Sequence, residues 1–173
     1  VKVIEAMNRI CLGAERHYEA EGGDCSSINV RFERIDQAIA MAAMFMANNV
    51  QVQAIVALTE SGSSAQWLSR VRSPVPIFAL SPNRESRRRM ALFRGVYPIA
   101  HDFPSANVEE TLAGGVHMLF LQGRIKAGER IIMTMGDQTG NEGGTNSLRL
   151  VQIGEDGLVE YNPSLDICPI NLD

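Results

Sequence analysis

The sequence lacks the features that mark a membrane protein, a secreted disulfide scaffold or a nucleic-acid-binding protein. No apolar run approaches the roughly 18 residues that a membrane-spanning helix needs. Only three of the 173 residues are cysteine, and none of them has C-x-x-C spacing. Sixteen basic residues stand against 20 acidic ones, and the net charge of −4 is not that of a general nucleic-acid binder. We therefore expect neither a membrane nor a nucleic acid as a partner.

The cysteines and the first residues together indicate the compartment. Cys11, Cys25 and Cys168 are odd in number, which favours free thiols in a reducing compartment, and this predicts the cytoplasm. Charged residues interrupt the first 20 positions, so no signal-peptide pattern is present. The chain starts inside a predicted helix, and we expect it to be one part of a longer protein.

Four short apolar runs alternate with helical patterns and predict a mostly parallel sheet. Each run is continuous, which is typical of a strand buried on both faces. The predicted strands are 54–58, 76–80, 96–100 and 131–135. The predicted helices are 1–19, 34–49, 62–72, 83–94 and 105–122.

A fifth strand is predicted at 148–153. Only 12 residues separate it from the fourth strand, and four of them are glycine, so they leave no room for the helix that a parallel crossover needs. The fifth strand is therefore expected to run antiparallel to the fourth. The fold class is α/β: a three-layer sandwich with a five-stranded, mostly parallel sheet, the last strand antiparallel, and helices on both faces.

The residues after the first predicted strand, which we call the hydroxyl-rich segment 59–64, are the strongest candidates for a binding site. They lie where a strand hands over to a helix, at the sheet edge where α/β proteins bind ligands. Unpaired N–H groups at a helix start attract anions, and Gly62 lets a ligand approach the backbone. A phosphate-binding loop is one interpretation, and a helix cap made by Ser61 or Ser63 is the other. The hydroxyl groups of this segment belong to Thr59, Ser61, Ser63 and Ser64.

The long loop 136–146 is the second candidate. It leaves the fourth strand at its carboxyl end, the same sheet edge as the hydroxyl-rich segment. A loop of this length in a compact domain is usually functional. Two loops at one edge can form two sides of a small-molecule site. A hairpin connection without a ligand is the alternative.

The remaining polar residues form no recognisable catalytic group. The histidines have no metal-ligand spacing with a cysteine, and the acidic residues are expected to face solvent. The arginine-rich segment 84–89 is predicted to be a solvated helix face or a contact with a second subunit. We therefore predict no catalytic residue and no metal site in this chain. The residues considered are His17, His101, His117, Asp102, Glu109 and Glu110.

Motifs in order along residues 1–153 resemble the C-terminal domain of pyruvate kinase. The first resembles the helix that leads out of the family's barrel, and the second resembles a strand with its phosphate loop. The third matches a "PI-A-L … AL-RGVYP" pattern, and the fourth the family's closing GTN segment. They are residues 3–15 (VIEAMNRICLGAE), 54–65 (AIVALTESGSSA), 76–80 with 91–98 (ALFRGVYP), and Gly144-Thr145-Asn146.

The resemblance implies a regulatory domain at 34–153. Residues 1–33 would be a helix and linker leading out of a catalytic barrel, and residues 154–173 are an unassigned tail. The parent enzyme would transfer a phosphoryl group from phosphoenolpyruvate to ADP with Mg²⁺ and K⁺, using an upstream barrel and a capping domain that are missing here. The chain alone is therefore expected to be catalytically silent. The resemblance also implies a homo-oligomer, a dimer for this part and a tetramer for the parent.

The resemblance further implies a site for a phosphorylated small-molecule effector. The effector's phosphate would be held by Thr59, Ser61, Gly62, Ser63 and Ser64. The loop that closes over the effector would include Gly140, Gly143, Gly144 and Thr145.

Two departures from the family pattern bear on the effector. Glu60 stands where animal forms that respond to fructose bisphosphate carry lysine, and Ser63 stands where many members carry arginine. The loss of positive charge disfavours a doubly phosphorylated sugar, so a sugar monophosphate or AMP is the expected effector. A purely structural oligomerisation domain with an unresponsive loop is one alternative. A free-standing α/β enzyme is another, and no nucleophile–base pair supports it.

Overall fold

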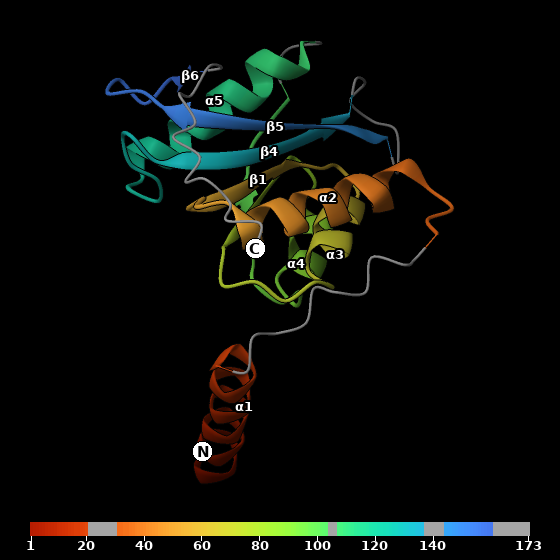
Figure 1. Cartoon of the computed structure of the whole chain (residues 1–173), viewed down its shortest axis with the longest axis vertical. Coiled ribbons are helices and arrows are strands. Elements are labelled where there is room, and N and C mark those ends of the chain that lie inside the picture. Colours follow the sequence, from red (N-terminus) through yellow and green to blue (C-terminus); the bar gives the residue numbers. More distant parts are fainter. Residues whose placement is uncertain (21–30, 104–106, 137–143, 161–173) are drawn as a thin grey trace, which may run out of the picture. The chain divides into compact units, whose positions relative to one another are not determined.

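The computed structural model describes residues 1–20, 31–103, 107–136 and 144–160 (Figure 1). The chain divides into two compact units, residues 1–31 and residues 32–173. The described part of the first unit is α1 (Lys2–Ala20), and it confirms the predicted helix. Val3, Met7 and Ile10 follow the three-and-four spacing that places apolar residues on one side of a helix.

The second unit is built on one six-stranded sheet with the order β3-β2-β1-β4-β5-β6. β1 pairs in parallel with β2 and β4, and β2 pairs in parallel with β3. β5 is antiparallel to β4, and β6 is antiparallel to β5. The fold class predicted from the sequence is confirmed. The strands are β1 (Ala54–Leu58), β2 (Ile77–Ser81), β3 (Val96–Ala100), β4 (Arg130–Gly136), β5 (Thr145–Ile153) and β6 (Val159–Glu160).

The short strand β6 was not predicted, because it lies in the segment that the sequence left unassigned. It pairs with the end of β5, where Ile153 lies opposite Val159. The turn between them contains Gly157 with a φ of 75°, where a Cβ atom would lie 2.3 Å from the ring of Phe120. Glycine at this position therefore lets the turn pack on α5, and the sheet has six strands rather than five.

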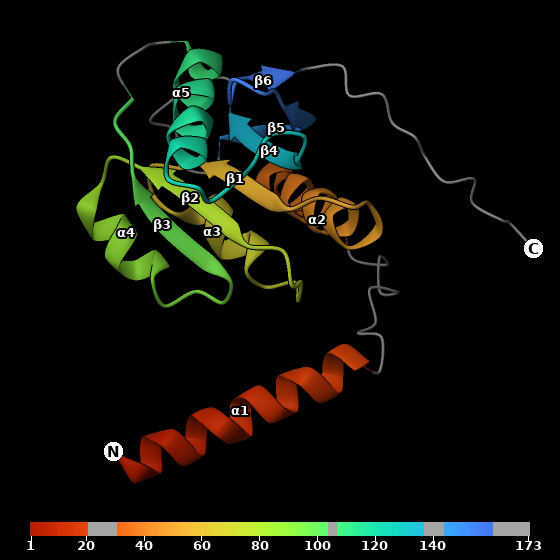
Figure 2. The same ribbon diagram turned by 90° about the vertical axis from the view of Figure 1, so that its left-hand side faces the viewer.

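Helices cover both faces of the sheet (Figure 2). α5 packs on one face, and α2, α3 and α4 pack on the other, which completes the three layers. α3 and α4 are shorter than predicted, because the chain tightens at their ends into i→i−3 hydrogen bonds, from Val71 to Leu68 and from Phe93 to Met90. The helices are α2 (Ile35–Asn49), α3 (Ser63–Leu68), α4 (Arg84–Met90) and α5 (Val108–Leu121).

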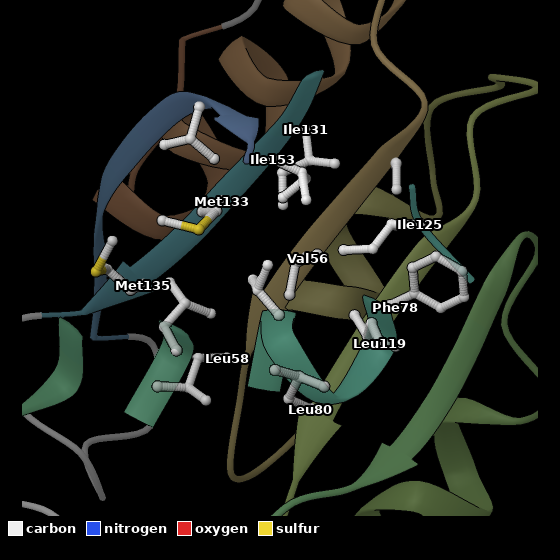
Figure 3. Close-up of a cluster of buried hydrophobic side chains, with 14 of the residues drawn as sticks. Val56, Leu58, Phe78, Leu80, Leu119, Ile125, Ile131, Met133, Met135 and Ile153 are labelled. Carbon is white, nitrogen blue, oxygen red and sulfur yellow. The ribbon is translucent and has the colours of Figure 1, made fainter. Parts of the chain in front are cut away.

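The side chains of the central strands divide between two hydrophobic clusters. All five residues of β1 are buried, which is why its sequence is a continuous apolar run. Val56 faces α5, where it joins Leu80 and Leu119 in the cluster drawn in Figure 3. Ile55 faces α2 and α3 in the second cluster. Burial of each large aliphatic side chain contributes about 1.5–3 kcal/mol, so this central strand anchors both layers.

Gly115 is the point where α5 approaches the sheet most closely among the glycines of that helix. A Cβ atom at Gly115 would lie 2.2 Å from Cδ1 of Leu80, which is completely buried. At the neighbouring Gly114, the nearest atom to a Cβ would be Cε1 of His101 at 3.9 Å. Packing therefore requires glycine at position 115 and not at position 114.

We predict that Gly115→Ala lowers the free energy of unfolding by about 1–3 kcal/mol, because the completely buried side chain of Leu80 would have to shift within the core. Gly114→Ala is the matched control, and its better helix propensity adds up to about 1 kcal/mol. Urea denaturation of the two variants measures both effects. Equal stability of the two variants would contradict this packing.

Candidate functional site

The hydroxyl-rich segment lies at the carboxyl end of β1, where the sequence placed it. Residues 59–62 form the turn, and α3 begins at Ser63. Gly62 has a φ of 87° in the left-handed region, and a Cβ atom there would lie 3.0 Å from Cγ of Met90. Both the backbone conformation and the close approach to α4 therefore require glycine at this position.

The strand order places this segment at the same sheet edge as the described ends of the second candidate loop, Gly136 and residues 144–146. β1 lies between β2 and β4, so the chain leaving β1 goes to one side and the chain leaving β4 goes to the other. Because β1 and β4 are parallel, both loops start at the same sheet edge. Such a divergence is a topological switch point, the usual ligand position in open α/β sheets.

A hydrogen bond joins the two candidate loops. The hydroxyl groups of Ser64 and Thr145 are bonded to each other, and the residues are only 5% and 7% exposed. One hydroxyl donates and the other accepts, so the accepting group keeps its own hydrogen for a further acceptor. Thr145 was predicted as part of the closing loop, and it lies directly against the hydroxyl-rich segment.

A β-bulge turns Thr145 toward α3. Met135 lies opposite Ser147, and Gly136 opposite Thr145, so Asn146 is an extra residue in β5. Regular alternation would point Thr145 to the α5 side, like Val151. The bulge changes that direction. It also needs Gly136, since a Cβ there would lie 2.3 Å from the carbonyl oxygen of Gly144.

The predicted residues of the closing loop fall into two groups. Gly144 and Thr145 lie at the start of β5, beside the end of β4. Gly140 and Gly143 lie outside the described residues. The assignment of these four positions to an effector therefore stays a prediction.

The segment's own side chains occupy some of its donors. Oγ1 of Thr59 accepts from the N–H of Gly62 at 3.0 Å, and Oγ of Ser61 accepts from the N–H of Ser63 at 3.3 Å. The N-cap of α3 is Gly62 and no side chain caps this helix, so the alternative interpretation of a cap made by Ser61 or Ser63 is wrong. Within the described part of the chain, the N–H groups of Ser64 and Ala65 donate to no acceptor.

Ser63 is held by a buried carboxylate that the sequence analysis missed. Its hydroxyl donates to Oδ2 of Asp36 at 3.3 Å. Asp36 is 1% exposed and also accepts two hydrogen bonds from the guanidinium of Arg34, at 3.0 and 2.9 Å. The available signal was a lone acidic residue on the apolar stripe of α2, in step with Ala40 and Ala43.

Two arginines of α4 brace the edge of the site. Nη1 of Arg87 donates to the carbonyl oxygens of Ser81 and Pro82, both at 2.7 Å, and Nη2 of Arg89 donates to the carbonyl oxygen of Ser61 at 2.9 Å. Arg89 is exposed, as the predicted solvated helix face requires, whereas Arg87 is half-buried. Arg89 in addition brings a positive charge to the hydroxyl-rich segment.

The other titratable candidates lie apart from this site or serve structural contacts. Nε2 of His101 is hydrogen-bonded to the carbonyl oxygen of Thr111 at 2.8 Å, and Glu109 is paired with Arg149. Asp102, Glu109 and Glu110 are exposed, as predicted. Among the described residues, no three His, Cys, Asp or Glu side chains could together hold a metal ion. In the same part of the chain, every helix is too short or too polar to cross a membrane.

We predict that Ser64→Ala and Thr145→Val are strongly non-additive in stability. Each change alone removes one partner of a buried pair and costs about 1 kcal/mol or more. Together they remove both partners, so the double variant should recover about 1 kcal/mol relative to the sum. The control is the double variant Ser64→Ala with Thr111→Val. The buried hydroxyl of Thr111 donates to the carbonyl oxygen of Asn107 and not to Ser64, so the two stability effects should add. Additivity in the Ser64 and Thr145 pair, measured by urea denaturation, would argue against the contact.

Comparison with known proteins gives the family. The family model described as pyruvate kinase, alpha/beta domain, matches residues 37–151. Pyruvate kinase II of Salmonella typhimurium is 35% identical over 153 residues, which cover 88% of this chain and 32% of that protein. The pyruvate kinase of Buchnera aphidicola subsp. Acyrthosiphon pisum is 38% identical over 148 residues, covering 85% of this chain and 30% of that protein.

A third relative, the pyruvate kinase of Haemophilus influenzae, is 37% identical over 145 residues, covering 79% of this chain and 28% of that protein. The chain thus spans about a third of the length of the curated relatives it matches. The fold class, the motifs and the family match agree, and the chain belongs to the pyruvate kinase family, of which it contains the alpha/beta domain.

Proposed function

We propose that this chain is the regulatory and subunit-assembly part of a pyruvate kinase. In this proposal the hydroxyl-rich segment 59–64 binds the phosphate group of a small-molecule effector. The parent enzyme transfers a phosphoryl group from phosphoenolpyruvate to ADP in the cytoplasm, with chemistry that lies outside these residues. The Mg²⁺ and K⁺ that the family implies would be bound by that parent enzyme.

One observation carries the effector site: the hydrogen bond between Ser64 and Thr145 at the switch point of the sheet. It brings a hydroxyl from each candidate loop to one place, where one hydroxyl hydrogen remains for a ligand. The N–H groups of Ser64 and Ala65 add two further donors. α3 has only six residues, so these local donors, rather than a long helix dipole, would hold the phosphate.

The charges around the segment favour an effector with a single phosphate group. Glu60 is exposed within the segment, and Asp36 lies behind Ser63. Arg89 donates to the carbonyl oxygen of Ser61, Arg34 to the carboxylate of Asp36, and Arg87 to the carbonyl oxygen of Ser81 nearby. Glu60 and Asp36 offset most of the positive charge of Arg34, Arg87 and Arg89, which disfavours a second phosphate. A sugar monophosphate or AMP therefore fits better than a sugar bisphosphate.

We expect ribose 5-phosphate, glucose 6-phosphate or AMP at millimolar concentration to shift the backbone amide NMR signals of residues 59–64. Ser64→Ala should weaken this binding about tenfold, because a hydrogen bond to a charged phosphate is lost. Ser69→Ala is the matched control, since the hydroxyl of Ser69 donates to Gln66 within α3 instead. No shift with any of the three ligands would refute the effector site.

The outward face of α2 favours a second role in assembly. Ile35 and Phe45 are 68% and 48% exposed, and Ala42 between them is also exposed. These positions follow the helical spacing of one face. Since α2 is apolar on both sides, its outer face fits an interface with a second copy of the chain.

We expect the chain to sediment as a dimer and Phe45→Lys to shift it toward monomer, because a charge would be buried at the interface. Leu92→Lys, at another apolar position that is 87% exposed, is the control and should not change the sedimentation coefficient. If the dimer forms and no effector binds, the purely structural alternative holds. A monomer at all concentrations would contradict the assembly role.

A further inference from the structure

We propose that Asp36 determines which anions the hydroxyl-rich segment accepts, by keeping the hydroxyl of Ser63 away from the ligand and a negative charge behind it. The proposal rests on the proposed function of that segment. It goes further by naming a residue of α2 that restricts the ligand's charge and position.

Asp36 is a buried carboxylate whose side chain accepts hydrogen bonds from several donors. Its side chain accepts from Nε and Nη2 of Arg34, from the N–H of Gln37 and from the hydroxyl of Ser63. The exposed fraction of Asp36 is 1%. A buried charge needs this degree of compensation, and Arg34 supplies the opposite charge. Ser63 is the member of the set that comes from the candidate site.

The bond to Asp36 changes what Ser63 can offer a ligand. A serine hydroxyl has a single hydrogen, so a hydroxyl that donates to Asp36 presents only lone pairs in other directions. A phosphate oxygen also needs a donor, and it would meet lone pairs instead. The phosphate is therefore expected to bind at Ser64 and Thr145 and to leave Ser63 aside.

The charge of Asp36 acts in the same direction. A phosphate held near Ser63 would lie close to a carboxylate that water does not screen, and like charges repel strongly in such surroundings. Arg34 balances this carboxylate, but its guanidinium is already engaged by both carboxylate oxygens. Removal of the negative charge should therefore lower the electrostatic repulsion of an anion held near Ser63.

The test measures the affinity of the full 173-residue chain for inorganic phosphate by calorimetric titration at low salt. Asp36→Asn keeps the shape of the side chain, and it should bind phosphate about tenfold more tightly than the unchanged chain. Ser63→Ala should bind phosphate as the unchanged chain does. Glu155→Gln is the control, because it removes one exposed acidic group in the turn after β5, at the opposite sheet edge.

The outcomes separate this proposal from the function on which it rests. If neither the unchanged chain nor Asp36→Asn binds phosphate, both fail. If the unchanged chain binds phosphate but Asp36→Asn binds it no more tightly, only the role of Asp36 fails. The role of Asp36 also fails if Glu155→Gln raises the affinity for phosphate as much as Asp36→Asn does. If Asp36→Asn does not fold, Ser63→Ala decides alone: unchanged affinity supports the proposal, and a clear loss of affinity overturns it.

Discussion

The position of β1 between two parallel neighbours is the constraint on which the rest of this structure depends. β2 and β4 pair with its two edges, and helices cover both of its faces, so every residue of β1 is buried. The loops after β1 and β4 must then diverge at one edge of the sheet. The bulge at Asn146 and the hydrogen bond between Ser64 and Thr145 join these loops again. The candidate site is thus a consequence of strand order.

Much of the fold could be predicted because its strands are short and apolar. β1 and β4 are buried on both faces, and a continuous apolar run signals that environment directly. The antiparallel direction of β5 followed from a connection too short for a helix. The order of the strands could not be predicted, since pairing depends on contacts far apart in the chain. β6 was missed because two residues carry no periodic pattern.

The candidate site was predicted in its position more than in its details. Hydroxyl groups next to Gly62 indicated a candidate binding loop after the first strand. In the structure this loop lies at the carboxyl end of β1, at the switch point of the sheet. Which hydroxyl faces which partner depends on packing, and the sequence could not show that Ser63 donates to Asp36. Arg89 was likewise assigned to solvent, because a run of arginines on a short helix carries no sign of the carbonyl group that one of them contacts.

The central claim is that a phosphate ester binds where the loop after β1 meets the start of β5. A crystal structure of this chain with ribose 5-phosphate tests it most directly. The account predicts density for the phosphate within hydrogen-bond distance of Ser64 and Thr145, with the sugar directed away from Asp36. A phosphate bound elsewhere would contradict the account. So would the absence of phosphate density at Ser64 and Thr145 in a crystal that holds the ligand at saturating concentration.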